Sequence, residues 1–247
     1  MRKIYFFLFA SFLFFSCDKD EPIIEPQDTF ISLSVQPKFG TENLYLDSIY
    51  TTIEGYDFKV LDFKFYLTDV KNGESNLTDA LLYDFRETGN LALRKVGDPT
   101  KFSSLQGSTG VIQSLNHSDP STFPNESPLN ISNAGQMHWG WNTGYIFIVI
   151  EGKVDTIANQ IPLFDHNFSF HIGTDTYLGD FSFTNLSWIK KSTYEYELPL
   201  KFEFDNFLQN NLQSINLKTE NLTHTAAGQQ ALTLKVLQNF KQAFKPN

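Results

Sequence analysis

The sequence contains a single cysteine, Cys17, in 247 residues. One thiol cannot form a disulfide within the chain and cannot build a cysteine-rich metal site, so any metal would have to use His, Met, aromatic or oxygen donors. Basic residues are also few, because 19 Lys and Arg stand against 28 Asp and Glu, for a net charge of −9. Since phosphate binding requires an excess of positive charge, we expect no nucleic-acid partner.

The motifs of several enzyme classes are absent as well. The sequence has no G-x-S-x-G, no H-E-x-x-H and no glycine-rich phosphate loop after a strand. The scattered carboxylates of residues 174–180 do not have the spacing of an EF-hand loop. Nothing selects a pair of catalytic carboxylates, and we therefore predict that the protein is not an enzyme.

The N-terminus has the features of a secretion signal. Residues 1–3 are basic, and residues 4–15 are apolar but too few to span a bilayer as a helix. Ser16 stands directly before Cys17, which resembles a bacterial lipobox, where signal peptidase cuts and the thiol carries diacylglycerol. An ordinary secretory signal with an incidental cysteine is the alternative. We predict a signal peptide over residues 1–17 and lipidation at Cys17.

Acidic residues follow the cysteine at positions 18, 20 and 21. They resemble the surface-export signals of some Gram-negative lipoproteins, so we expect outer-membrane attachment through the lipid, with the protein facing the periplasm or the cell surface. Two prolines and alternating acidic residues in 21–27 are typical of an extended tether. We therefore predict a tether over residues 18–28 and one β domain over residues 29–247.

The remaining sequence favours strands over helices. Phenylalanine occurs 25 times and aromatic residues make up 15% of the chain, enough to fill a large β-sheet core. Alternating apolar and polar residues predict strands, while apolar residues at near-helical spacing predict a helix over residues 226–244. The predicted strands are residues 30–35, 43–46, 56–70, 81–85, 145–151, 167–172 and 193–204. These signals indicate an all-β domain with a C-terminal helix.

Two further features refine this prediction. Residues 88–136 are rich in Gly, Ser, Asn and Pro, which predicts a long, weakly structured loop that is functional or mobile. Pro199 predicts that the strand around it lies at a sheet edge or contains a bulge, because proline has no N–H to pair.

The densest group of functional residue types lies in residues 137–145, directly before an apolar strand. It contains two of the chain's three tryptophans and one of its five histidines, namely His138, Trp139 and Trp141. A second dense piece, residues 168–173, contains His171. We expect these two pieces to face each other and to form the functional site.

Residues 137–145, M-H-W-G-W-N-T-G-Y, followed by E-G at 151–152, resemble the M-x-W-x-W-x-x-G-Y…E-G signature of the MbnP-like copper-binding family. Other pieces match in order: L-N-H-S-D-P at 115–120 with P-L at 128–129, F-H-I-G at 170–173, and L-T-H-T at 222–225 before the C-terminal helix. The resemblance extends over residues 30–244 and is dense in the second half. The chain thus resembles a bacterial lipoprotein member of this family.

The resemblance implies an extracytoplasmic antiparallel β-sandwich or barrel-like domain of Greek-key type with long loops. Some members, and related methanotroph surface proteins, bind copper through histidines and an oxidised tryptophan, kynurenine, which a dihaem peroxidase-like partner makes in some of them. Imidazole suits Cu(I) and Cu(II), and kynurenine adds a nitrogen donor that an indole lacks. The implied function is copper binding for metal handling. The alternative is a surface structural or interaction lipoprotein that uses the aromatic motif only as core.

Carried over to this sequence, Trp139 or Trp141 is the candidate for oxidation and His171 is the distant ligand. Related proteins pair the modified residue with a histidine two positions away, whereas here Trp141 occupies that position and the nearby histidine is His138. Adjacent strand residues point to opposite faces, so His138 and Trp139 would share a metal only if their segment is a turn. The candidate metal ligands are His138, His171, His117 and His224.

Each candidate also has a structural alternative. His171 would be a core histidine bonded to backbone, and His117 would cap a turn. His138 would pack against the tryptophans, and His224 would hold the start of the C-terminal helix. The two tryptophans and Tyr145 would pack in the core. The loop residue His166 is expected at the surface, and the carboxylates of Asp165 and Asp175 either orient an imidazole or are solvated.

Overall fold

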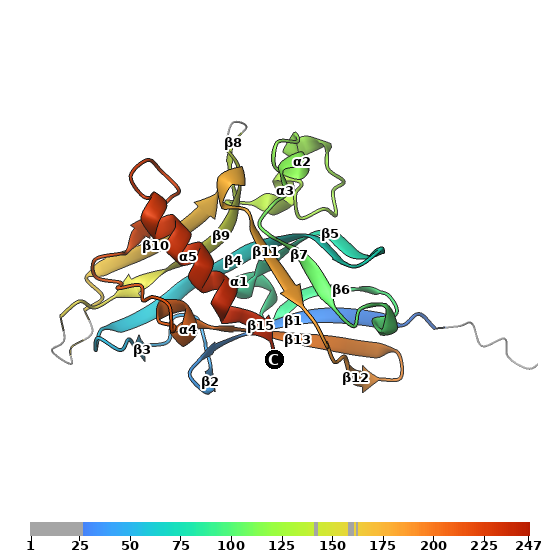
Figure 1. The fold of residues 1–247 in the computed structure, drawn as a ribbon, viewed down its shortest axis with the longest axis horizontal. Helices are drawn as coiled ribbons and strands as arrows, with labels where there is room; N and C mark the ends of the chain where they lie inside the picture. The colour runs from blue at the N-terminus through green and yellow to red at the C-terminus, as the bar shows by residue number, and fades with distance from the viewer. Residues whose placement is uncertain (1–26, 141–142, 158–160, 162) are drawn as a thin grey trace, which may run out of the picture.

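The computed structural model describes residues 27–140, 143–157, 161 and 163–247. Two curled β-sheets form its body, and the C-terminal helix lies obliquely across one side (Figure 1). The predicted β-rich fold with a C-terminal helix is therefore confirmed. The predicted signal peptide, Cys17 and most of the predicted tether lie outside the described residues. Within those residues, no helix is long and apolar enough to cross a membrane.

The first sheet contains strands from both ends of the domain. Its hydrogen-bonded order is β12 (Ile189–Ser192), β13 (Glu195–Glu203), β1 (Phe30–Phe39) and β2 (Glu42–Asn43), with β15 (Phe244–Pro246) also beside β13 and β6 (Leu91–Val96) also beside β1. The strands β1 and β13 run parallel, with Leu33 opposite Leu198. The sheet thus contains the first and the last strand of the described residues.

The second sheet carries the residues of the candidate site. Its order is β11 (Gly179–Phe183), β7 (Leu105–Thr109), β4 (Asp57–Asn72), β9 (Gly144–Val154), β10 (His166–Gly173) and β14 (Leu222–Thr223), with β3 (Tyr50–Thr51) and β5 (Ser75–Asp84) also beside β4 and β8 (His138–Gly140) beside β9. The helices are α1 (Phe85–Thr88), α2 (Gln113–Asn116), α3 (Ile131–Ala134), α4 (Phe204–Leu208) and α5 (Gln230–Ala243), and the 3-10 turns are η1 (Pro99–Lys101), η2 (Pro120–Thr122) and η3 (Asp175–Tyr177).

Phenylalanine side chains from both sheets and from α5 meet in the core. The ring of Phe63 on β4 lies 4.6 Å from that of Phe202 on β13. Phe240 of α5 contacts both sheets, with ring centroids 4.9 Å from Phe202 and 5.3 Å from Phe65. Because strand residues alternate between faces, burying Phe63 and Phe65 turns Asp62 and Lys64 to the opposite face of β4. That opposite face carries the candidate site.

Two sequence predictions are wrong in detail. The predicted loop of residues 88–136 contains the strands β6 and β7, which pair with β1, β4 and β11. Their sequences alternate weakly, and pairing with distant strands decides their structure. The strand around Pro199 is not at an edge, because β13 has β1 on one side and both β12 and β15 on the other. Pro199 lies between the stretch of β13 that pairs with β12 and the stretch that pairs with β15. Neither strand pairs with Pro199 itself, so its missing N–H leaves no hydrogen bond of these two pairings unmade.

Candidate functional site

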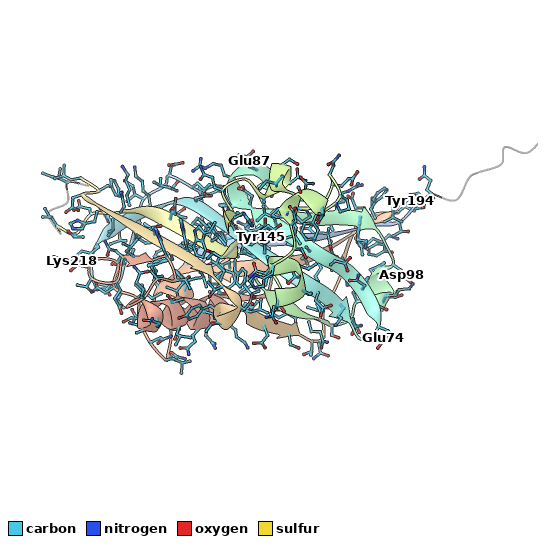
Figure 2. The ribbon with its side chains drawn as sticks, turned by 90° about the horizontal axis from the view of Figure 1, so that it is seen from above. Glu74, Glu87, Asp98, Tyr145, Tyr194 and Lys218 are labelled. Atoms are coloured by element: carbon cyan, nitrogen blue, oxygen red, sulfur yellow. The ribbon has the colours of Figure 1, made fainter. Side chains whose placement is uncertain are left out.

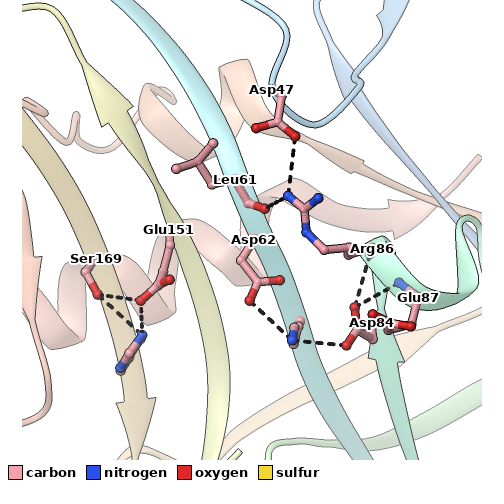
Figure 3. A network of polar contacts seen from close by, with 10 residues as sticks. Asp47, Leu61, Asp62, Asp84, Arg86, Glu87, Glu151 and Ser169 are labelled. Carbon is pink, nitrogen blue, oxygen red and sulfur yellow. Dashed lines mark hydrogen bonds and ion pairs between the residues drawn. The ribbon is translucent and has the colours of Figure 1, made fainter. Parts of the chain in front are cut away.

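The strand β9, which continues from the tryptophan motif, lies beside the second motif segment, because β9 and β10 pair in antiparallel fashion. Ser169 stands opposite Glu151, and His171 stands opposite Val149. Side chains two residues apart on a strand share a face, so Glu151, Ser169 and His171 point to the same side of the sheet. Figure 3 shows Ser169 and Glu151 directed toward each other from neighbouring strands.

The imidazole of His171 is bonded to both of these side chains. Its Nε2 lies 2.7 Å from Oε1 of Glu151 and 3.3 Å from Oγ of Ser169. The Ser169 hydroxyl also donates to Glu151 at 3.2 Å. The hydrogen bond from His171 holds the pKa of the Glu151 carboxyl below its usual range, against burial, which acts to raise it. The carboxylate is therefore ionised at neutral pH.

His224 joins these residues from the far end of the sequence. It follows β14, which pairs parallel to β10 with Thr223 opposite Phe170. The next residue, Thr225, closes the edge of β10, because its hydroxyl donates to the His171 carbonyl at 2.9 Å and accepts from the Gly173 N–H at 3.1 Å. The Gln229 side chain accepts from the His224 N–H at 2.8 Å. These bonds fix the backbone on both sides of His224.

The rings of His224 and His171 are stacked, with centroids 4.5 Å apart and planes 10° from parallel. Nε2 of His224 lies 3.2 Å from the Ser169 hydroxyl, which Nε2 of His171 also contacts. Burial, followed by the closeness of His171, lowers the pKa of His224. We call Glu151, Ser169, His171 and His224 the histidine cluster. It offers two imidazoles and a carboxylate around one hydroxyl.

An acidic row continues from the histidine cluster on the same face of the sheet. Asp62 stands opposite Glu151, and Lys64 lies 3.3 Å from Asp62 and 3.1 Å from Asp84 (Figure 3). Burial raises the pKa of Asp62, although Lys64 acts to lower it. Oδ1 of Asp62 is buried without a hydrogen-bond partner among the described residues. The carboxylates of Glu151, Asp62 and Asp84 thus lie near a single lysine, Lys64. This excess of negative charge favours the binding of a cation on this face of the sheet.

Replacing Asp62 with Asn tests this electrostatic arrangement. A pKa raised in the folded state means that the stability from this group is present below the unfolded pKa of 3.8 and is lost as pH rises through the folded value. We therefore expect Asp62→Asn to stabilise the protein by about 1 kcal/mol more at pH 7 than at pH 3. Urea unfolding at both pH values measures this, with Asp79→Asn on the same sheet as a control. An equal effect at both pH values would contradict it.

Two other candidate histidines do not join the cluster. Nε2 of His117 lies 2.8 Å from Asp175, whose pKa is lowered by hydrogen bonds from Asn116 and His117 although burial acts to raise it. The ring of His138 packs edge-on against Tyr145 with centroids 4.8 Å apart, and burial lowers its pKa. The strand partner of His171 is Val149. Tyr145 lies four residues before Val149 on β9, a distance of about 13 Å along the strand.

The part of the tryptophan motif that contains His138 and Trp139 is extended. His138 and Trp139 belong to the strand β8, which pairs with β9, so they point to opposite faces and do not form the turn that a shared metal would need. Trp139 is half-buried against the core, and its ring lies so close to Gly173 that a Cβ there would stand 2.5 Å from it. Trp141 lies outside the described residues. Trp139 is thus near β10, two residues beyond His171.

The remaining predicted partners have other roles. Asp165 pairs with His166 at 2.8 Å and accepts from the Thr156 N–H at 3.0 Å, so it holds a loop. The carboxylate that orients His171 is Glu151, which sequence reasoning quoted only as part of the family signature. Its signal was a charged residue directly after the buried run of β9, opposite a polar residue of β10.

Thr174, three residues beyond His171, has a strained backbone. Its φ of 66° and ψ of 148° lie in a region that β-branched residues almost never occupy. We expect Thr174→Gly to raise the free energy of unfolding by about 1 kcal/mol, because glycine adopts this conformation without strain. Chemical denaturation measures the change, and Thr174→Ala, which keeps the Cβ, is the control. If alanine stabilised as much as glycine, the strain would not be at the backbone.

The MbnP family model matches residues 28–243 of the chain. Among solved structures, MbnP from Methylosinus trichosporium is similar, with 13% sequence identity and a TM-score of 0.43 over 74% of this chain and 77% of that chain. No curated protein matches. The residues matched by the family model include the strands β4, β5, β9 and β10 and the residue His224 after β14, which together carry the histidine cluster and the acidic row.

Proposed function

Because the chain belongs to the MbnP family, we propose that it is a lipid-anchored extracytoplasmic protein that binds copper for metal handling. Of the four candidate ligands, His171 and His224 are the pair that would hold the ion, with Glu151 as an oxygen donor. The observation that carries this proposal is that Nε2 of both histidines contacts the same hydroxyl, on Ser169.

The chemistry of the donor set fits copper. Two neutral imidazoles and one carboxylate are suitable ligands of Cu(II), and two imidazoles alone suit Cu(I). Ligands of one metal at about 2 Å each lie within about 4 Å of one another, and here Nε2 of His171 and Nε2 of His224 lie 3.3 Å and 3.2 Å from the same Ser169 oxygen. Bound copper would supply a redox-active positive charge beside the acidic row.

The cluster is not preformed for a metal. Lone pairs of imidazole nitrogens lie in the ring plane, so two stacked rings do not aim them at a common point. Within the described ranges, no three His, Cys, Asp or Glu side chains are spaced to hold a metal ion as they stand. Binding would therefore require the His171 and His224 rings to turn and the His171 to Glu151 hydrogen bond to open. Ser169, which contacts both rings, would orient them during this change.

Tryptophan oxidation is the second part of the proposal. The indole ring of Trp139 packs over Gly173, at the end of the strand that carries His171. We expect Trp139 or Trp141 to be the residue converted to kynurenine by a dihaem peroxidase-like partner. The mass of the peptide that contains both residues, from protein purified from native cells, tests this. An unmodified mass would remove kynurenine from the proposal but leave the histidine ligands.

Membrane attachment through Cys17 is the third part. The described chain begins beside Tyr194, because the Phe30 N–H donates to the Tyr194 carbonyl at 2.8 Å. Tyr194 and Lys218 lie at opposite ends of the long axis (Figure 2), so a membrane anchor would attach at the Tyr194 end. We expect Cys17→Ser to move the protein from the membrane fraction to the soluble extracytoplasmic fraction. Retention of this variant in the membrane would rule out the lipid anchor.

Copper retention tests the function as a whole. The full-length protein would be mixed with one equivalent of Cu(II), passed through a desalting column and analysed for metal, with Zn(II) and Mn(II) in parallel. We expect copper to be retained in preference to manganese, which favours oxygen ligands. If no copper remained, the alternative would hold, namely a surface structural or interaction lipoprotein in which the histidine cluster is a hydrogen-bonded surface feature.

A further inference from the structure

A groove of about 570 Å³ lies between the strands β5 and β6 and the segment of residues 115–129. Its walls are mainly apolar, with Ala80 and Leu82 from β5, Leu93 from β6, and Phe123 and Pro128 from the covering segment. The covering segment is anchored, because the hydroxyls of Tyr66 and Tyr145 donate to the carbonyls of Pro128 and Leu129. None of these wall residues belongs to the histidine cluster.

The groove continues along β5 into a second hollow of about 470 Å³, which shares Leu82, Glu126 and Pro128 with it. This end is acidic, since Glu87 and Glu126 line it. Neither glutamate forms an ion pair with a described residue, and Glu87 stands at the molecular surface (Figure 2). The whole depression is thus apolar at one end and negatively charged at the other.

The outer edge of β5 faces this groove and is open. Among the described strands, β5 pairs only with β4. Leu67 of β4 pairs with both β5 and β7, so these two strands lie on opposite sides of β4. The Tyr66 carbonyl accepts from the Gly110 N–H, which places the hydrogen-bonding groups of Tyr66 on the β7 side. Leu82, which pairs with Tyr66, therefore directs its own N–H and carbonyl away from β4 and into the groove.

The neighbouring carbonyls on this edge already have partners. The Ala80 carbonyl accepts from the Thr78 hydroxyl at 2.9 Å, and the Leu77 carbonyl accepts from Nζ of Lys95 on β6 at 2.8 Å. No side chain or backbone group of the described chain donates a hydrogen bond to the Leu82 carbonyl. An open strand edge is a template for an added strand unless proline, charge or a cover protects it. Here the covering segment of residues 115–129 does not pair with the edge of β5, and a groove lies between them.

We propose that β5 binds an extended peptide segment of a partner protein, which adds as a strand along this edge. The Leu82 N–H and carbonyl would pair with the peptide backbone, and alternate apolar side chains of the peptide would fill the groove beneath Phe123 and Pro128. Lysine or arginine residues at one end of the peptide would meet Glu87 and Glu126. An unpaired edge supplies affinity for any extended chain, while the apolar and acidic walls supply the preference for apolar and basic residues.

The test uses peptide pools as probes with the full-length protein. One pool of peptides, each about ten residues long, alternates Val, Ile, Leu or Phe with Thr or Ser and ends in Lys-Arg; a second ends in Glu-Asp. A third matches the first but has Pro at every second position, which prevents strand addition. We expect the first pool to bind most tightly, with protection of the Leu82 amide from hydrogen exchange, the second to bind more weakly, and the third not to bind. Absence of binding by the first pool, or equal binding by all three, would overturn the proposal.

Two variants separate the parts of the groove. Leu82→Pro removes the outward N–H and is expected to weaken binding by about tenfold or more. Glu87→Gln with Glu126→Gln is expected to weaken it by about threefold or more at low salt and hardly at all at high salt. Glu42→Gln with Glu54→Gln, two exposed glutamates elsewhere, is the matched control. Thermal unfolding checks that Leu82→Pro folds. If that variant does not fold, the glutamate variants and the amide protection decide the result, and no change in either would contradict the proposal.

Discussion

Copper affinity is expected to fall by about a hundredfold or more when His171 or His224 is replaced by alanine, and to change little in His117→Ala or His138→Ala. Loss of one imidazole leaves one nitrogen donor in the cluster, because the other two histidines lie beside Asp175 and Tyr145. Competition against a chelator of known affinity measures the change. The two distant variants are the matched controls, since they remove the same chemical group from other sites.

A graded set of variants sharpens this first prediction. Glu151→Gln keeps the hydrogen-bonding shape of the side chain but removes its charge, so we expect a loss of about tenfold. Ser169→Ala removes the hydroxyl that contacts both rings but no metal ligand, so its loss is expected to be smaller than that of either histidine. A loss in His138→Ala equal to that in His171→Ala would place the site at the tryptophan motif instead.

Gly152→Ala is expected to lower the free energy of unfolding by about 3 kcal/mol, the largest stability effect that we predict. A Cβ at this position would lie 2.1 Å from the Lys59 carbonyl oxygen and 2.2 Å from the Phe168 ring. The carbonyl belongs to the β4 backbone, which pairs with β9 at this point, so relief would require the two strands to move apart. Denaturant unfolding measures the loss.

The matched control for this prediction is Gly179→Ala. An added Cβ there would lie 3.2 Å from Cδ1 of Leu237, the end of a side chain that can shift. We expect it to cost less than about 1 kcal/mol. Similar losses in the two variants would mean that removing glycine flexibility, and not the close approach of β4 to β9, determines the effect.

The two strands that carry the site could be predicted from the sequence alone. Residues 145–151 and 167–172 have the β-branched and aromatic composition of strands, and the structure extends them to Gly144–Val154 and His166–Gly173. The helix predicted over residues 226–244 is observed as Gln230–Ala243, because its buried side chains recur at helical spacing. Local composition and periodicity decide these elements, and both can be read from one sequence.

The composition of the cluster could not be predicted in the same way. Which residue faces His171 depends on strand register, and β4 and β10 both change register through irregularities, between Val60 and Asp62 and between Ile172 and Gly173. A one-residue shift exchanges the faces of a strand, so alternation alone does not place Asp62 opposite Glu151. The approach of His224 depends on a two-residue parallel pairing between segments about fifty residues apart, which leaves no periodic signal.

The central claim is that two imidazoles of one cluster bind copper, and pulsed electron paramagnetic resonance of the Cu(II)-loaded full-length protein tests it most directly. This measurement counts coordinated imidazoles through the remote nitrogen of each ring. We expect two coordinated imidazoles in the wild-type protein, one in His171→Ala and one in His224→Ala, with no change in His117→Ala or His138→Ala. Two imidazoles that persist in both His171→Ala and His224→Ala, or no bound copper in the wild-type protein, would contradict it.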